Sequence, residues 1–459
     1  MKIKMKIVLL LLLAGNLYAQ APKKWSLEEC IQHAVAHNID IKKTALQKEQ
    51  AEVDLNTAKM SRLPDLNAGM GQQWNFGRSN KTLLGIYENQ TASNSNFYIS
   101  SSIPLFTGFK IPNQIAQNKL QLEAVAYNLE KAKEDLSLNV AALFLQVLFN
   151  KEILKVSEEQ STLSQLQVKK TETLVEIGKV PASQLYDIKA QAAKDEVDVT
   201  ESKNRLQLSL LDLAQCLELE HISDFDIAAP GADNAIENNM NGILPPENIY
   251  AQAVTVKPQI KEQETLVQSA EKALKIAQSG YYPSLNLEMG YGTSYYYNYT
   301  MQGKTAIDAT GQPYTWYNEA FGRQFKNNMG EYIGLSLTIP IFNRFAVRNQ
   351  VKNARLNIQD RQLTLENTKK KLYKEIQTAR LDAVAAQAKY ISSKKAVEAS
   401  REAFKYAEER YEIGKSTVYE FNESKARLFN SLSEQIKAEY DYIFRCKILD
   451  FYTGIPIKL

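Results

Sequence analysis

The chain has 459 residues, of which 55 are Lys or Arg and 52 are Asp or Glu. The N-terminal segment holds three of the lysines and no acidic residue, so the remainder is close to neutral, which argues against nucleic-acid binding driven by phosphate contacts. The three cysteines, Cys30, Cys216 and Cys446, are odd in number and widely spaced, so they do not form a disulfide framework.

Residues 1–19 have the pattern of a secretory signal peptide. Lys2, Lys4 and Lys6 form a basic start, an apolar run covers 7–14, and Ala19 is a small residue at a plausible cleavage point. No Cys follows that point, so lipid attachment there is not indicated. We find no later run of 18 or more apolar residues and therefore expect no transmembrane helix.

A helical segment is expected from about 26 to 62, and SLEE at its start (26–29) has the pattern of a capping box. Within it, Cys30, His33 and His37 stand at i, i+3 and i+7, so all three could share one helix face and ligate zinc or copper. A mixed, solvent-facing helix is the alternative, because the sequence offers no evident fourth ligand. We assign no metal site and no cofactor.

Four later segments alternate apolar residues with small or polar ones, over about ten residues each. In the last of them, Ile333, Leu335 and Leu337 alternate with Gly334 and Ser336. This length and period is typical of membrane-spanning barrel strands, and the aromatic residues at their ends resemble interfacial girdles. A half-buried antiparallel sheet on helices would show the same alternation. The predicted strands cover about 66–76, 97–106, 284–295 and 331–342.

Four strands cannot close a membrane barrel, because an open sheet edge is not tolerated in lipid. Strands that span a membrane therefore predict an oligomer. A dimer would give eight strands around an interior filled by side chains, whereas twelve strands from a trimer would leave a lumen.

Two unusually long helices are predicted at 115–177 and 346–413, which contain no Pro and no Gly. At about 1.5 Å per residue each would reach roughly 95–100 Å. Their apolar residues recur at spacings of three and four, which is the pattern of a packed coiled-coil seam. Shorter helical partners are expected at about 183–220, 248–280 and 417–452.

The tetrapeptide EIGK occurs at 176–179 and again at 412–415, with Gly178 and Gly414 at the end of each long helix. Gly enters the left-handed region without a Cβ penalty, so both copies predict helix, tight turn, helix. The two glycines are 236 residues apart, as are IPLF (103–106) and IPIF (339–342). The sequence therefore predicts a twofold duplication. The repeats are 20–223, with a tip turn at 176–182, and 249–459, with a tip turn at 412–417; a linker covers 224–248.

The signal peptide, the duplication, the paired hairpins, the IPLF and IPIF exits and the YxxG turn in RYEIGK together resemble the TolC family of bacterial outer membrane efflux proteins. The resemblance covers nearly the whole mature chain. It implies a mixed membrane fold: a homotrimer whose shared 12-stranded β-barrel lies in outer membrane lipid and continues as a helical barrel of antiparallel coiled coils across the periplasm.

The function implied by the resemblance is that of a passive exit duct in a tripartite efflux or type I secretion system. Its implied partners are a periplasmic adaptor (membrane fusion) protein and an inner-membrane pump of the RND or ABC type. The adaptor would dock on the tip turns, at Gly178, Lys179, Gly414 and Lys415.

The resemblance also implies a gate just after these turns. The matching positions are Glu420 and Glu423 in the second half, Gln184 and Asp187 in the first, and Tyr411 for a pore-facing tyrosine. Three copies would surround a narrow pore with six glutamates, a ring that should favour cations and raise the pKa of its own members. However, TVYE (417–420) also reads as a capping box for Glu420, and Tyr411 could equally be an aromatic of the seam.

No nucleophile elbow, phosphate loop or catalytic carboxylate pair stands out, so we do not expect an enzyme. The alternative to a duct is a periplasmic coiled-coil scaffold that has a small soluble sheet and no pore.

Overall fold

The computed structural model of the chain describes residues 24–80, 87–220, 225–228, 245–308, 310–455 and 457. The predicted signal peptide (1–19) and most of the predicted linker (224–248) lie outside these ranges. The chain divides into two compact units. The helical unit is drawn from Met1–Lys48, Ala124–Glu264 and Thr364–Leu459, and the unit that holds the main sheet from Glu49–Glu123 and Thr265–Leu363.

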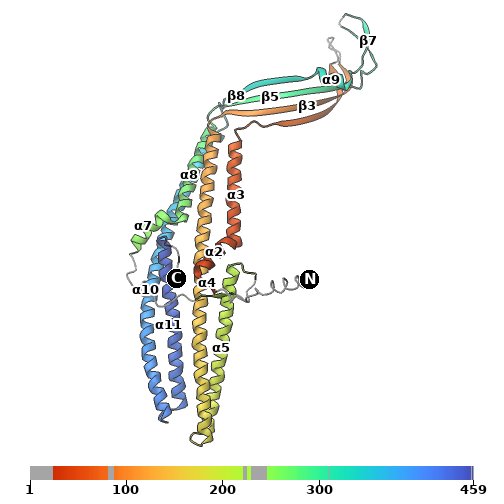
Figure 1. Cartoon of the computed structure of the whole chain (residues 1–459). Helices are drawn as coiled ribbons and strands as arrows, with labels where there is room; N and C mark the ends of the chain where they lie inside the picture. The colour runs from red at the N-terminus through yellow and green to blue at the C-terminus, as the bar shows by residue number, and fades with distance from the viewer. Residues whose placement is uncertain are drawn as a thin grey trace, which may run out of the picture. The chain divides into compact units, whose positions relative to one another are not determined.

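Eight of the described helices form pairs of equal length, one member of each pair before residue 217 and the other after 245. The pairs have 11, 22, 67 and 35 residues. In chain order the first set is α2 (Leu27–His37), α3 (Ile39–Met60), α4 (Lys110–Glu176) and α5 (Ala182–Cys216); the second is α7 (Pro246–Val256), α8 (Pro258–Ser279), α10 (Ala346–Glu412) and α11 (Val418–Tyr452). In the helical unit, α4 turns back into α5 and α10 turns back into α11, which gives two long hairpins (Figure 1).

The segments 26–62 and 248–280 each contain a break that was not predicted. At Asn38 the side-chain Oδ1 accepts hydrogen bonds from the backbone N–H groups of Asp40 (2.9 Å) and Ile41 (3.3 Å), so this residue ends α2 and caps α3. The second break is at Lys257, directly before Pro258. Proline disfavours the helical conformation in the residue before it and is tolerated in the first turn of the next helix.

The main sheet is antiparallel, with strand order β2-β3-β5-β8 (Figure 1). Its strands are β2 (Asn67–Asn80), β3 (Tyr87–Thr107), β5 (Ser284–Asn298) and β8 (Gly330–Thr338). The last strand ends before the predicted residue 342, because Pro340 has no N–H to donate to a ladder. Within the described chain, β2 and β8 each pair along one edge only.

The register of the sheet separates its side chains by polarity. Leu337 lies opposite Leu285, and Leu335 lies opposite Leu287, which in turn lies opposite Ile103. The neighbouring positions place Ser336 opposite Asn286. Because side chains alternate between the faces of a strand, one face of the sheet is apolar and the other carries mainly Gly, Ser, Asn and Gln.

The C-terminal end of β5 extends past its pairing with β8 and is covered by a short helix, α9 (Phe321–Asn327). The side-chain amide of Gln324 accepts from the N–H of Tyr296 (3.0 Å) and donates to its C=O (2.9 Å). Asn318 makes the same pair of contacts with the backbone of Asn298, at 2.8 and 3.0 Å. Two side-chain amides thus satisfy backbone groups that a strand would otherwise pair. The same loop holds a hairpin of β6 (Thr305–Ile307) and β7 (Pro313–Thr315).

The main core lies in the helical unit, where α4 supplies Val140, Phe144 and Leu148 and α5 supplies Leu213. A short parallel pair, β1 (Lys24–Trp25) and β4 (Asp226–Ile227), packs against it. Among the described helices, α4 alone is long and apolar enough to cross a membrane by length and composition.

Candidate functional site at the helical turns

The two turns that join the hairpins have the same backbone geometry. Gly178 has a φ of 70° and Gly414 a φ of 73°. The N–H of Gly178 donates to the C=O of Val175 (2.9 Å), and the N–H of Lys179 donates to the C=O of Leu174 (2.8 Å). The second turn repeats both bonds, from Gly414 to Tyr411 (3.0 Å) and from Lys415 to Arg410 (2.8 Å). Both are Schellman motifs, in which the left-handed glycine lets the last helical carbonyls find donors.

Glu420 is the third residue of α11 and completes the capping box that TVYE predicts. Its carboxylate accepts from the N–H of Thr417 (3.1 Å) and the hydroxyl of Ser416 (2.6 Å), while the Thr417 hydroxyl accepts from the N–H of Glu420 (3.2 Å). The hydrogen bond from Ser416, followed by that from Thr417, lowers the pKa of Glu420. This direction within one chain is opposite to that expected from repulsion in a ring.

Glu423 lies one turn further along α11, exposed to solvent, and forms an ion pair with Arg427 (3.1 Å). In the first half, Asp187 is exposed on α5 and Gln184 is half-buried. All four candidate gate positions therefore lie within the first two turns after a Schellman motif, two on each hairpin.

Tyr411 packs within the chain. Its ring stacks on Phe421 with the centroids 5.0 Å apart, and it lies against a cluster of Phe404, Phe421 and Leu428. Leu163 of α4 packs against the same cluster. The tyrosine thus belongs to the apolar contact between the two hairpins, as expected for an aromatic residue of the seam.

Cys30, His33 and His37 do not converge on a metal position. Cys30 is fully buried in the main core, where burial raises the pKa of its thiol to about 12. The imidazoles of His33 and His37 stack on each other, 4.0 Å apart, and His37 Nδ1 contacts the C=O of His33 (3.0 Å). Among the described residues no group of three or more His, Cys, Asp or Glu side chains could hold a metal ion. The capping box at Ser26 and Glu29 is confirmed.

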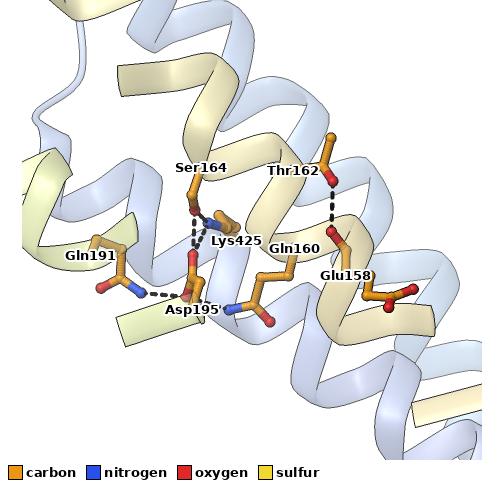
Figure 2. A network of polar contacts seen from close by, with 7 residues as sticks. All are labelled: Glu158, Gln160, Thr162, Ser164, Gln191, Asp195 and Lys425. Atoms are coloured by element: carbon orange, nitrogen blue, oxygen red, sulfur yellow. Dashed lines mark hydrogen bonds and ion pairs between the residues drawn. The ribbon is translucent and has the colours of Figure 1, made fainter. Parts of the chain in front are cut away.

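A buried charged cluster that was not predicted lies between the two hairpins (Figure 2). Lys425 of α11 and Asp195 of α5 form an ion pair with Nζ and Oδ2 2.6 Å apart, and the side chains are 3% and 0% exposed. Ser164 of α4 contacts both charged groups. The amides of Gln160 and Gln191 donate to the other carboxylate oxygen, at 2.8 and 2.9 Å.

This cluster is a structural junction. A serine hydroxyl beside a lysine amine is also the arrangement of a Ser-Lys nucleophile. Here Ser164 is only 4% exposed and both of its charged neighbours are buried, so no substrate reaches the hydroxyl. The Asp195 carboxylate accepts from Gln160 and Ser164 of α4 and from Lys425 of α11, besides Gln191 of its own helix α5, so a single residue links three helices.

One signal in the sequence could have found Lys425. It stands four residues after Phe421 and three before Leu428, both of which are buried apolar residues of α11. Positions three and four apart share one helix face, so a lysine at this place points into the seam and needs an anionic partner. The identity of that partner was beyond local pattern, because Asp195 is 230 residues away in the chain.

Comparison with known proteins agrees with this architecture. A family model described as "Outer membrane efflux protein" matches residues 30–217 and 249–454. Outer membrane protein TolC of Escherichia coli (strain K12) is 22% identical over 458 residues, which covers 96% of this chain and 84% of TolC.

Solved structures share the fold. The CmeC outer membrane channel of Campylobacter jejuni superposes with a TM-score of 0.71 at 17% identity, covering 94% of this chain and 86% of CmeC. The MtrE outer membrane channel of Neisseria gonorrhoeae, crystallised in an open state, gives a TM-score of 0.70 at 16% identity, covering 94% of this chain and 90% of MtrE. At these identities the likeness concerns the fold.

Proposed function

Because this chain belongs to the outer membrane efflux protein family, we propose that three copies of it form one passive exit duct through the outer membrane, gated at the helical tips. The observation that carries the proposal is the four-stranded sheet, which has one apolar face and two edges without a partner in the described chain. In lipid such edges must be paired, and twelve strands from three copies close a barrel.

The polarity of the two faces supports an open lumen. On the apolar face, Ile333, Leu335 and Leu337 are 78%, 68% and 60% exposed in the single chain, which suits contact with lipid. The opposite face holds Gly334 and Ser336 on β8 and Asn286 on β5. Small and polar side chains on that face would line a wet channel through which solutes pass without tight binding.

We assign the gate to the ring that Glu420 and Glu423 would form with their copies, with Asp187 and Gln184 on the neighbouring hairpin. Of the two glutamates, Glu420 already accepts hydrogen bonds in the capping box of α11. Glu423 has only an exposed ion pair with Arg427, and such a pair contributes about 0–1 kcal/mol, so its carboxylate can turn toward a pore at little cost.

The tip turns are the proposed docking surface for a periplasmic adaptor protein coupled to an inner-membrane pump of the RND or ABC type. Each turn presents an exposed isoleucine beside an exposed lysine: Ile177 and Ile413 are 68% and 66% exposed, next to Lys179 and Lys415. A trimer would repeat this pair six times around the ring. The pump would supply the energy, and the duct itself would catalyse no reaction.

The test is single-channel recording of the purified mature protein in a planar bilayer, with the variant Glu420→Gln/Glu423→Gln beside the wild type. Gln still accepts the hydrogen bond of a capping box, so the substitution removes charge and keeps the cap. We expect a small, cation-selective conductance in the wild type and loss of selectivity in the variant. Pores with unchanged selectivity would refute the acidic gate. Absence of pores from folded protein would refute the duct and favour a periplasmic coiled-coil scaffold.

A further inference from the structure

The duplication extends to the residues of the buried cluster. At the separation of 236 residues that relates the two glycines, Lys189 corresponds to Lys425, and Ser164 corresponds to Ser400. Lysine and serine are therefore kept in both halves. The acidic residue is not, because the counterpart of Asp195 is Ser431.

In the first half, the space beside Asp195 and Ser164 is occupied by a side chain from the other hairpin. The side chain of Lys425 extends from α11 into the space between α4 and α5. Asp195, Ser164, Gln160 and Gln191 lie around it there (Figure 2). The contact is made within one chain, and it places the α10/α11 hairpin on one particular side of the α4/α5 hairpin.

In the second half, the equivalent position is a groove of about 520 Å³ on the α10/α11 hairpin. Its lining includes Ala396, Arg427 and Ser431, the counterparts of Gln160, Gln191 and Asp195. Ser400 and Ser431 bridge α10 and α11 beside it, with their hydroxyl oxygens 3.0 Å apart. The groove thus lies where the repeat predicts that a lysine from a neighbouring α5 would enter.

We propose that this groove binds the side chain of Lys189 from α5 of a second copy of this chain. The inference rests on the proposed trimer: in a closed ring of alternating hairpins, each α10/α11 hairpin has an α4/α5 hairpin of its own copy on one side and one of the next copy on the other. Lys189 is available for this contact, since its side chain is 47% exposed and its partner is Glu172 on the adjacent helix of the same hairpin (2.8 Å).

The two kinds of junction differ in strength. Within a copy, Lys425 meets a buried carboxylate. Between copies, Lys189 would meet the hydroxyls of Ser400 and Ser431. The two glutamates that line the groove, Glu423 and Glu434, are already paired with Arg427 and Lys389. The junctions between copies are therefore expected to be the weaker ones.

Disulfide cross-linking distinguishes the two junctions. We expect Lys189→Cys/Ser431→Cys to give covalent dimers and trimers on a non-reducing gel, and Ser164→Cys/Lys425→Cys to give a product within one chain. The native Cys30, Cys216 and Cys446 stay in place as background, because burial raises the pKa of each thiol and slows its reaction. Cross-links within single chains from the first pair would overturn the proposal.

A charge variant tests the proposed contact between Lys189 and the groove without a disulfide. Ser431→Asp restores the acidic residue of the first half, and we expect it to slow dissociation of the detergent-solubilised trimer about tenfold, the effect of a modest interfacial charge pair. The gain should vanish in Ser431→Asp/Lys189→Met. If Ser431→Asp acts equally in both backgrounds, Lys189 does not occupy the groove. A protein that conducts ions and is trimeric but fails both tests would refute this contact and leave the duct intact.

Discussion

Removing one member of the buried Lys425–Asp195 pair should strongly reduce the stability of the helical unit. Breaking such a pair from one side typically costs about 3–5 kcal/mol, because the remaining charge is buried without compensation. Lys425→Met leaves the carboxylate with three donors, from Ser164, Gln160 and Gln191. Asp195→Leu leaves the ammonium with the Ser164 hydroxyl. We therefore expect the lysine variant near the lower end of that range and the aspartate variant near the upper end.

The assay is denaturant unfolding of the detergent-solubilised protein, monitored by far-UV circular dichroism. In each single variant the denaturant concentration at the midpoint should fall, while the dependence of the unfolding free energy on denaturant stays the same. Asp195→Leu/Lys425→Met should recover most of the loss, since apolar replacement of both partners is often neutral. Lys370→Met is the matched control, because Lys370 pairs with Glu366 on an exposed face of α10 and such a pair contributes about 0–1 kcal/mol. The reasoning is refuted if Lys425→Met costs no more than Lys370→Met, or if the two losses simply add.

Three further predictions concern local features. Gly414→Ala should cost about 1–2 kcal/mol in the same unfolding assay, because its φ of 73° places a Cβ in the left-handed region, whereas Gly322→Ala, at a negative φ inside α9, should not be destabilising. Glu420→Ala should destabilise the protein above pH 4.5, and the difference from wild type should disappear as the pH falls through the lowered pKa of Glu420 in the fold; a difference that persists in acid would contradict the charged cap. Cys30 should resist a thiol reagent until the protein unfolds, since its thiol is buried with a pKa of about 12, and rapid labelling of folded protein would contradict this.

Regular periodicity made the long elements predictable from the sequence. The Pro-free and Gly-free stretches became α4 and α10, and a glycine at the end of each became the turn. The breaks at Asn38 and Lys257 were missed, although both have local signals: Asn38 is a common helix-capping residue, and Lys257 precedes Pro258. The early end of β8 could have been read from Pro340. The contact of β5 with α9 and with Asn318 just before it could not be predicted, since it depends on side-chain amides that take the place of a pairing strand.

For the candidate site, local motifs were predictable and long-range contacts were not. Thr417 and Glu420 form a cap through residues three apart, which the sequence displays directly. Lys425 finds its partner on another hairpin, and only the fold brings the two together. For Lys189, the duplication predicted from the sequence would supply this information, because a contact seen once in the structure identifies where its counterpart would fall.

The duct, the gate and the junction between copies all require three chains in one complex, so the most direct measurement is the native mass of the detergent-extracted mature protein. We predict a single species whose mass is three times that of the mature chain. A folded monomer or dimer under conditions that preserve outer membrane protein complexes would contradict the account, because its sheet would retain edges that lipid does not tolerate.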